Sequence, residues 1–242
     1  AKCYGLKHLV AISPGFQADF VVLDNLQDLN VTDVFYKGKL VDRNAPIRVK
    51  TCGRALKHTV HLDKVKAEQF VLPIGKKKTH VIGINPSQIT TEDLAVSLQP
   101  AANYVPTDGY SKVAAVERHH NTGKIGVAVA KGYGIRNGAV ASSVSHDSHN
   151  IIVIGDNDRD MALAVDEIIR TQGGYTVVEN GEVFETLPLP IMGLMSDAGF
   201  ESVNETLGRM IKKAHEMGVP ADIEPFITLS FLALPVIPTL RI

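Results

Sequence analysis

"VSHDSHNIIVIG", residues 144–155, places a densely polar stretch directly before a strand pattern, and the fold can be worked out from this point. Residues 151–155 read IIVIG, a short apolar run of the kind that forms a strand buried on both faces. Residues 146–150 read HDSHN and crowd two histidines, an aspartate, a serine and an asparagine together. We therefore expect a buried strand with a polar site at its start.

Further strand patterns lie on both sides of this run. Residues 111–120 and 124–134 are expected to pair through the turn Asn121-Thr122-Gly123. Residues 175–190 contain the clearest hairpin, because Asn180-Gly181 suits a type I′ turn. Three earlier runs, each closed by a proline, are also expected to be strands: 67–73, 79–86 and 93–100.

Apolar residues at helical spacing predict two helices. The first follows Asp156 or Asn157, either of which is a good N-cap, and it is expected to end at Gly173-Gly174. The second is expected to end at Gly218. The apolar faces comprise Met161, Val165, Ile168 and Ile169 in the first helix, and Val203, Leu207, Met210, Ile211 and Ala214 in the second.

Residues 14–41 form an all-β stretch. A Pro-Gly turn at Pro14 precedes the strand Phe20–Leu23, and two later strand runs meet in a hairpin at Lys37-Gly38. The composition turns polar from about 44 to 53, and Pro46 interrupts the pattern there. The expected fold class is α+β, with one region at 1–53 and a mixed α/β domain at 54–242.

Composition sets the broad class of the protein. The 242 residues are 45% apolar and 21% charged, with a formal net charge of -1, so neither nucleic acid nor an anionic membrane surface is an expected partner. The most apolar segment, residues 226–238, is too short to span a bilayer and is expected to be buried core. Only Cys3 and Cys52 occur, which favours a reducing cytoplasm over a disulfide framework.

His146, Asp147, Ser148, His149 and Asn150 form the first candidate site. Three interpretations are open: a metal site using His146 and His149, catalytic or substrate contacts, or a structural polar turn. The cluster lies between strands, so the logic of two histidines on one helical face does not apply. Asp147 could orient either imidazole by accepting its N–H.

Glu117, Arg118, His119 and His120 form the second candidate site, at the end of an apolar strand. One interpretation is a solvated strand end with a Glu–Arg ion pair. The other is that the four residues face the same cleft as residues 146–150. Four adjacent ionisable groups are costly to bury without partners. The sequence has no Gly-x-Ser-x-Gly elbow, so nucleophilic catalysis finds little support. It also has no phosphate-binding loop.

Several long blocks resemble a known family. Residues 5–24, "GLKHLVAISPGFQADFVVLD", resemble the segment that follows the metal-binding barrel in the amidohydrolase superfamily and enters a small β-sandwich. The matching positions there are Pro14, Gly15, Ala18, Asp19, Val21, Val22 and Leu23. Residues 114–161, 187–197 and 224–241 resemble the C-terminal domain of bacterial adenine deaminases, and the resemblance covers the whole chain.

The resemblance implies a function and a location for the chemistry. Adenine deaminases hydrolyse adenine to hypoxanthine and ammonia in purine salvage, with a divalent metal such as manganese, iron or zinc. The metal-ligand motifs of the family's TIM barrel cannot be found in this chain. The chain is therefore expected to be a C-terminal fragment, comprising part of the β-sandwich and the full C-terminal domain, that is inactive alone.

The same resemblance sets expectations for the two clusters and for assembly. Residues 146–150 and 117–120 are expected to lie near the barrel mouth and to help enclose or bind adenine. Missing sandwich strands should leave an apolar face of residues 14–41 exposed, which favours a homo-oligomer. The alternative is a free-standing, non-catalytic module for ligand binding or assembly.

Overall fold

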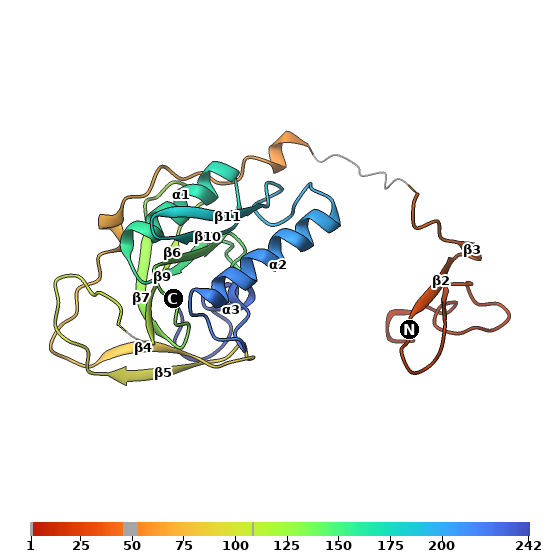
Figure 1. Ribbon diagram of the computed structural model, residues 1–242, viewed down its shortest axis with the longest axis horizontal. Helices are drawn as coiled ribbons and strands as arrows, with labels where there is room; N and C mark the ends of the chain where they lie inside the picture. The colour runs from red at the N-terminus through yellow and green to blue at the C-terminus, as the bar shows by residue number, and fades with distance from the viewer. Residues whose placement is uncertain (1, 46–52, 108) are drawn as a thin grey trace. The chain divides into compact units, whose positions relative to one another are not determined.

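The computed structural model describes residues 2–45, 53–107 and 109–242, which divide into two compact units (Figure 1). Unit 1 is Ala1–Thr51 and unit 2 is Cys52–Ile242. Pro46 and Cys52, at the expected domain boundary, lie outside the described residues. The strands form two open sheets, one of three strands and one of eight.

Unit 2 is built on the eight-stranded sheet, in the order β11-β10-β8-β9-β6-β7-β4-β5. Neighbouring strands are antiparallel except β4 and β7, which are parallel. The strands are β4 (Thr79–Ile84), β5 (Thr91–Val96), β6 (Tyr110–Val116), β7 (Ile125–Lys131), β8 (Gly138–Ser142), β9 (Ile151–Gly155), β10 (Gly174–Glu179) and β11 (Glu182–Pro188). The expected strand at 151–155 is confirmed as β9, and all of its residues are buried.

Helices cover both faces of this sheet, as Figure 1 shows. On one face Ile151 and Val153 pack with residues of α1 (Asp158–Thr171), such as Met161. On the other face Ile152 and Ile154 pack in a second core with α2 (Phe200–Glu216) and α3 (Pro225–Phe231). Alternate side chains of β9 therefore point into two cores, which explains why its sequence is apolar at every position.

Both ends of α1 lie where the sequence predicts them. Asn157 is the N-cap, and its side chain accepts the N–H of Asp160 at 2.8 Å. At the other end, Gln172 adopts the left-handed conformation (φ 59°) and caps the helix, so α1 ends directly before the expected Gly173-Gly174. Gly173 donates its N–H to the carbonyl of Ile168 at 2.9 Å, and it also allows close packing, because a Cβ there would lie 2.3 Å from the Cα of Gly193.

Two expectations for the apolar segments are corrected. Residues 67–73 are not a strand; they contain the 3-10 helix η3 (Ala67–Phe70), whose Phe70 is fully buried. Residues 226–238 are only partly core, because Phe226 and Leu229 of α3 are buried but Ile227 and Val236 are exposed. No helix among the described ranges has the length and hydrophobicity needed to cross a bilayer.

A buried lysine ties η3 to the start of α1. Lys112 on β6 is 1% exposed, and its Nζ donates to the carbonyl of Phe70 at 3.0 Å. The same Nζ contacts Asn103 Oδ1 at 2.9 Å and Asp158 Oδ1 at 2.5 Å. The ammonium thus finds three acceptors away from water, which offsets the cost of burying its charge.

Unit 1 contains β1 (Phe20–Leu23), β2 (Val31–Tyr36) and β3 (Lys39–Leu40), in that order across an antiparallel sheet. The expected strand and the hairpin at Lys37-Gly38 are confirmed. None of residues 3–45 is buried, although Phe20 stacks on Phe35 with ring centroids 4.7 Å apart. Such a sheet lacks a hydrophobic core of its own.

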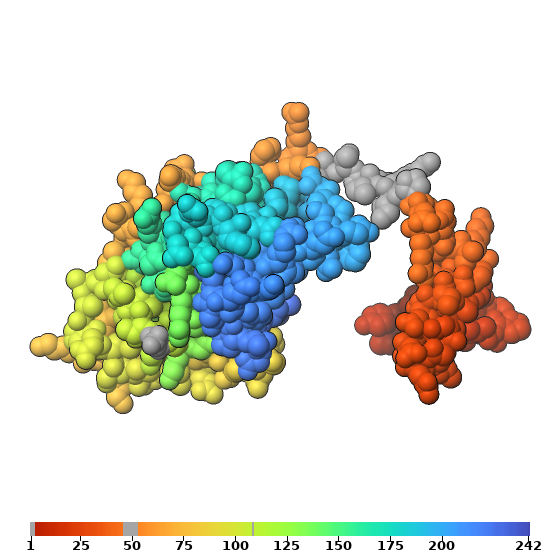
Figure 2. Space-filling model, in the orientation of Figure 1, coloured from red at the N-terminus to blue at the C-terminus, as the bar shows by residue number. Residues whose placement is uncertain are grey.

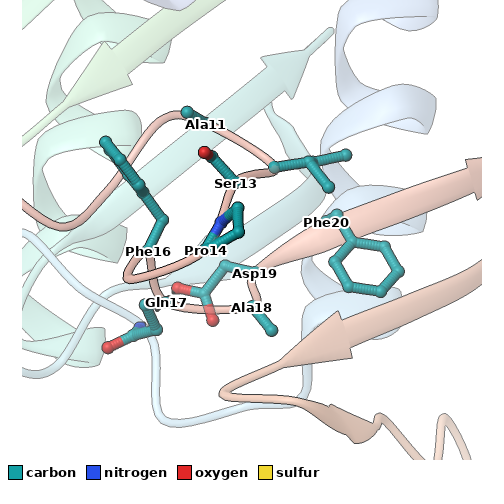
Figure 3. Close-up of a pocket in the computed structure, with 9 residues that line it drawn as sticks. Ala11, Ser13, Pro14, Phe16, Gln17, Ala18, Asp19 and Phe20 are labelled. Atoms are coloured by element: carbon teal, nitrogen blue, oxygen red, sulfur yellow. Dashed lines mark hydrogen bonds between the residues drawn. The ribbon is translucent and has the colours of Figure 1, made fainter.

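Apolar side chains of unit 1 are exposed, as expected from the sequence. Val21, Val22, Val31, Tyr36 and Leu40 are all exposed. A hollow of about 300 Å³ lies among residues 11–20, with Pro14, Phe16 and Phe20 in its lining (Figure 3).

A strand glycine offers a test of the packing between β8 and its neighbours. A Cβ at Gly138 would lie 2.0 Å from the carbonyl oxygen of Val178 and 2.5 Å from Met217 Cε. Gly138→Ala is therefore expected to lower the free energy of unfolding by about 3 kcal/mol or more, the upper range for overpacking. Urea unfolding followed by circular dichroism measures the change.

Gly126→Ala on β7 is the matched control, because its Cβ would meet only Ile242 Cδ1, at 4.0 Å. It should change the free energy of unfolding by less than about 0.5 kcal/mol. Equal effects of the two variants would contradict the packing described for β8.

Candidate functional site

The sheet register brings the two polar clusters together. β6 and β9 are antiparallel neighbours, with Val116 opposite Ile151. Residues 117–120 leave the end of β6 at the same edge of the sheet where residues 146–150 enter β9. We name residues 146–150 the histidine turn.

Hydrogen bonds connect the two clusters directly. Arg118 Nε donates to the carbonyl of His149, and His119 Nε2 lies 2.8 Å from the carbonyl oxygen of Ser148. Because a carbonyl can only accept, Nε2 of His119 carries the proton. The two clusters are therefore adjacent, and a common cleft for them stays a prediction.

Arg118 occupies the centre of this arrangement and is buried, with 1% of its surface exposed. Its Nη1 donates to the carbonyl of Thr59 at 3.1 Å, and its Nη2 donates to the carbonyl of Met192 at 3.0 Å. Burial lowers the pKa of the guanidinium. The interpretation as a solvated Glu–Arg ion pair is wrong, because Arg118 spends its donors on backbone carbonyls inside the protein.

Glu117 shapes the neighbouring turn. Its Oε1 accepts the backbone N–H groups of His119 (2.5 Å) and His120 (2.9 Å), and its Oε2 accepts the N–H and hydroxyl of Thr122 (3.1 and 3.0 Å). Partial burial alone would raise the pKa of Glu117, but these hydrogen bonds outweigh it and hold the pKa at about 2. The carboxylate is therefore charged and fully engaged at neutral pH.

His149 is held inside the histidine turn. Its N–H donates to the carbonyl of Ser145 at 2.6 Å, and its Nδ1 accepts the N–H of Ser145 at 3.4 Å, so Nε2 carries the ring proton of the neutral form. Burial lowers the pKa of His149, and the nearby His146 and Arg118 lower it further. The imidazole is accordingly neutral at pH 7.

His146 is fixed by the end of α3. Its ring stacks on Phe231 with centroids 4.9 Å apart, and its backbone N–H donates to the carbonyl of Ser230 at 3.0 Å. The His146 and His149 rings are 5.8 Å apart and tilted by 59°. Asp147 and Ser148, between them, are exposed.

The donor set does not fit a metal ion. Throughout residues 2–45, 53–107 and 109–242, no group of three or more His, Cys, Asp or Glu side chains is placed to hold one. Two imidazoles without a third ligand do not make a zinc site. The described residues therefore do not form a complete metal site.

A third segment belongs to the site and was missed from the sequence. Gly193 lies against the guanidinium, since a Cβ there would be 2.8 Å from Arg118 Nη1. Ser143 Oγ donates to the carbonyl of Gly193 at 2.6 Å and accepts the N–H of Gly174 at 2.8 Å. The available signal was Gly193 itself, a glycine in a run of apolar residues.

Two polar atoms, one just before the histidine turn and one at its last residue, have no hydrogen-bond partner among the described residues. They are the hydroxyl of Ser145 and Oδ1 of Asn150, and both are buried. Buried polar atoms are seldom left unpaired. A hydroxyl and an amide oxygen without partners in the described parts of the chain therefore lie beside the neutral imidazole of His149.

Comparison with known proteins defines the class to which this fold and site belong. The sequence model of the family described as "Adenine deaminase C-terminal domain" matches residues 88–242. This range includes both polar clusters and the segment around Gly193. The chain belongs to the adenine deaminase C-terminal domain family.

Individual relatives extend the match to the full chain. An adenine deaminase of Desulfitobacterium hafniense (strain Y51) is 50% identical, and one of Nitratidesulfovibrio vulgaris (strain DP4) is 44% identical. "Adenine deaminase 2" of Carboxydothermus hydrogenoformans is 40% identical. Each match covers 100% of this chain but only 43%, 43% and 44% of the respective relative. The chain thus spans less than half the length of these curated relatives.

The low pKa of Glu117 predicts a pH-dependent contribution to stability. A carboxyl group whose pKa is depressed on folding stabilises the protein above its ordinary pKa of 4.5, and the effect is lost as the pH falls towards about 2. Glu117→Gln should therefore lower the melting temperature at pH 6, and the gap to the unsubstituted chain should shrink between pH 4.5 and 2. Thermal melts by circular dichroism measure it.

Asp93→Asn is a suitable control, because Asp93 is an exposed carboxylate on β5 whose partner is the exposed His80. A gap for Glu117→Gln that is constant with pH, or no larger than that of the control, would show that the carboxylate charge does not hold the turn.

Proposed function

We propose that this chain is the C-terminal part of an adenine deaminase, which hydrolyses adenine to hypoxanthine and ammonia in purine salvage in the cytoplasm. The observation that carries the proposal is the match to proteins named adenine deaminase along all 242 residues, at 40–50% identity. The reacting centre and its divalent metal (manganese, iron or zinc) lie outside this chain.

Within such an enzyme, the histidine turn is the part of this chain that meets adenine. His149 is neutral with its proton on Nε2, which can donate to a purine ring nitrogen. Asp147 and Ser148 of the same turn are exposed, so their polar groups are open to contacts with the base. His119 borders the turn through its bond to Ser148. Enclosing the base in this way would exclude water and strengthen each polar contact.

The buried and engaged residues position the turn. Arg118 fixes the carbonyl of His149, Glu117 shapes residues 119–122, and Phe231 orients His146. We assign these side chains a positioning role, because the polar groups of Arg118 and Glu117 already have partners within the protein and Phe231 acts by stacking.

In this proposal, residues 1–53 and residues 54–242 belong to different domains of the full-length enzyme. Residues 1–53 are the end of the last barrel helix and part of the small β-sandwich, and residues 54–242 are the C-terminal domain. The lack of any buried residue in 3–45 supports the first assignment, since the apolar face of unit 1 suits packing against further strands.

His149→Ala in the full-length enzyme tests the role of the histidine turn. Loss of the Nε2 donor should lower kcat/KM for adenine by about 10-fold or more, since one such contact is worth about 1.4 kcal/mol. Steady-state assays of adenine turnover, with a thermal melt of each variant, measure the effect. Unchanged kcat/KM and unchanged stability would reject the active-site role.

Two controls separate chemistry from folding. His149→Asn keeps a residue that tolerates the positive φ of 50° at this position, so a kinetic loss without a stability loss identifies a contact to substrate. His80→Ala removes an exposed histidine on β4 and should leave kcat/KM unchanged. The 242-residue chain alone should show no turnover; turnover by it would place the chemistry on these residues. Tight adenine binding without turnover would favour a binding module instead.

Self-association is expected of the 242-residue chain. The exposed apolar side chains of unit 1 favour burial against another copy. Sedimentation velocity across a concentration series should show a dimer or larger species. Val21→Ser with Leu40→Ser on β1 and β3 should shift the distribution towards monomer; a monomer at every concentration for the unsubstituted chain would remove the proposal.

A further inference from the structure

The loop between β11 and α2 exposes a group of apolar side chains on unit 2. We name residues 189–200, which are this loop and Phe200, the first residue of α2, the methionine loop. Met192, Met195 and Phe200 of this loop are exposed, as is Leu56, to which the loop is hydrogen-bonded. In Figures 1 and 2 the light-blue loop lies beside the orange residues with which unit 2 begins. Exposed apolar side chains in one loop commonly mark a contact surface.

The loop is held rigidly although it has little regular secondary structure. The N–H of Met192 donates to the carbonyl of Leu56 at 2.6 Å, and the carbonyl of Gly193 accepts from Ser143 Oγ at 2.6 Å. Lys57 and Asp197 form an ion pair at 2.5 Å on the rim. An apolar centre fixed in place and bordered by charges has the form of a protein interface, and its rigidity lowers the entropy cost of binding.

One guanidinium joins this loop to the candidate site. Arg118 Nη2 donates to the carbonyl of Met192, while its Nε donates to the carbonyl of His149. A Cβ on Gly193 would lie only 2.8 Å from Nη1 of the same guanidinium, so the loop can pack this closely only with glycine at position 193. A domain that binds the methionine loop is therefore linked through Arg118 to the histidine turn, and its binding positions both segments.

We propose that the methionine loop and Leu56 are the surface on which the remainder of the full-length enzyme docks, so that the histidine turn is brought to the reacting centre. The inference rests on the proposed function. More than half of the length of the curated relatives lies outside the matched chain, while the match covers this chain completely. In every relative named above, the remaining stretch belongs to the same chain as the part that matches unit 2, so it is always available to bind this surface.

Cysteine labelling tests the docking surface in the full-length enzyme. Phe200→Cys and Val236→Cys form a matched pair, because these side chains are 73% and 74% exposed on unit 2. In the 242-residue chain at low concentration the two sites should react with a maleimide at similar rates. In the full-length enzyme the site at residue 200 should react about 10-fold more slowly than the site at 236, as expected for burial of one large apolar side chain.

Mass spectrometry of peptides reads each site separately, and circular dichroism confirms that both variants fold. Equal rates at the two sites in the full-length enzyme would overturn the proposal. Protection at 200 that grows with protein concentration would assign the surface to a second copy, and protection already present in the dilute 242-residue chain would assign it to unit 1; both results also overturn it. Adenine turnover of the same full-length samples shows separately whether the proposed function holds.

Discussion

The guanidinium of Arg118 lies away from water and donates to backbone carbonyls from three segments that are far apart in the sequence: Thr59, His149 and Met192. Burying a charge in this way is costly unless each donor finds an acceptor. Neutral carbonyls satisfy the donors without adding a second buried charge. The histidine turn, the entry to unit 2 and the methionine loop consequently take their positions from one side chain.

The sheet makes that convergence possible. β9 lies between β6 and β8, so the residues that follow β6 and those that precede β9 meet at one edge. α1 packs on one face and α2 and α3 on the other, which holds the central strands between two apolar layers. The polar groups gather where the strands end, and β9 itself carries none. Rigid strands thereby support a turn whose side chains remain available for contacts.

The periodic parts of the fold could be predicted from the sequence. β9, the β10–β11 hairpin at Asn180 and the N-cap at Asn157 follow from local patterns. The strand expected at 67–73 is instead the 3-10 helix η3, because Phe70 packs in a core built from distant residues and its carbonyl accepts from Lys112. The end of α1 before Gly173 is predictable locally, but the close approach of Gly193 to Gly173 is not.

The candidate site was predictable in part. The meeting of residues 117–120 with 146–150 could be proposed because both adjoin apolar strands. The burial of Arg118 could not, since its acceptors at residues 59 and 192 lie 59 and 74 positions away. An arginine next to a glutamate reads as an ion pair in sequence, and only the three-dimensional contacts show that each has other partners.

The sheet is unevenly joined along its width. β4 and β7 share only two paired positions, Ile82 with Ala130 and Gly83 with Lys131, whereas β6 and β7 pair over seven. The β4–β5 hairpin is held there mainly by side chains, because Ile82 and Ile84 of β4 are buried in the same core as Ile154 of β9. The outer margin of the sheet therefore depends on packing, whereas the half with the polar turn also has a continuous ladder of strand pairing.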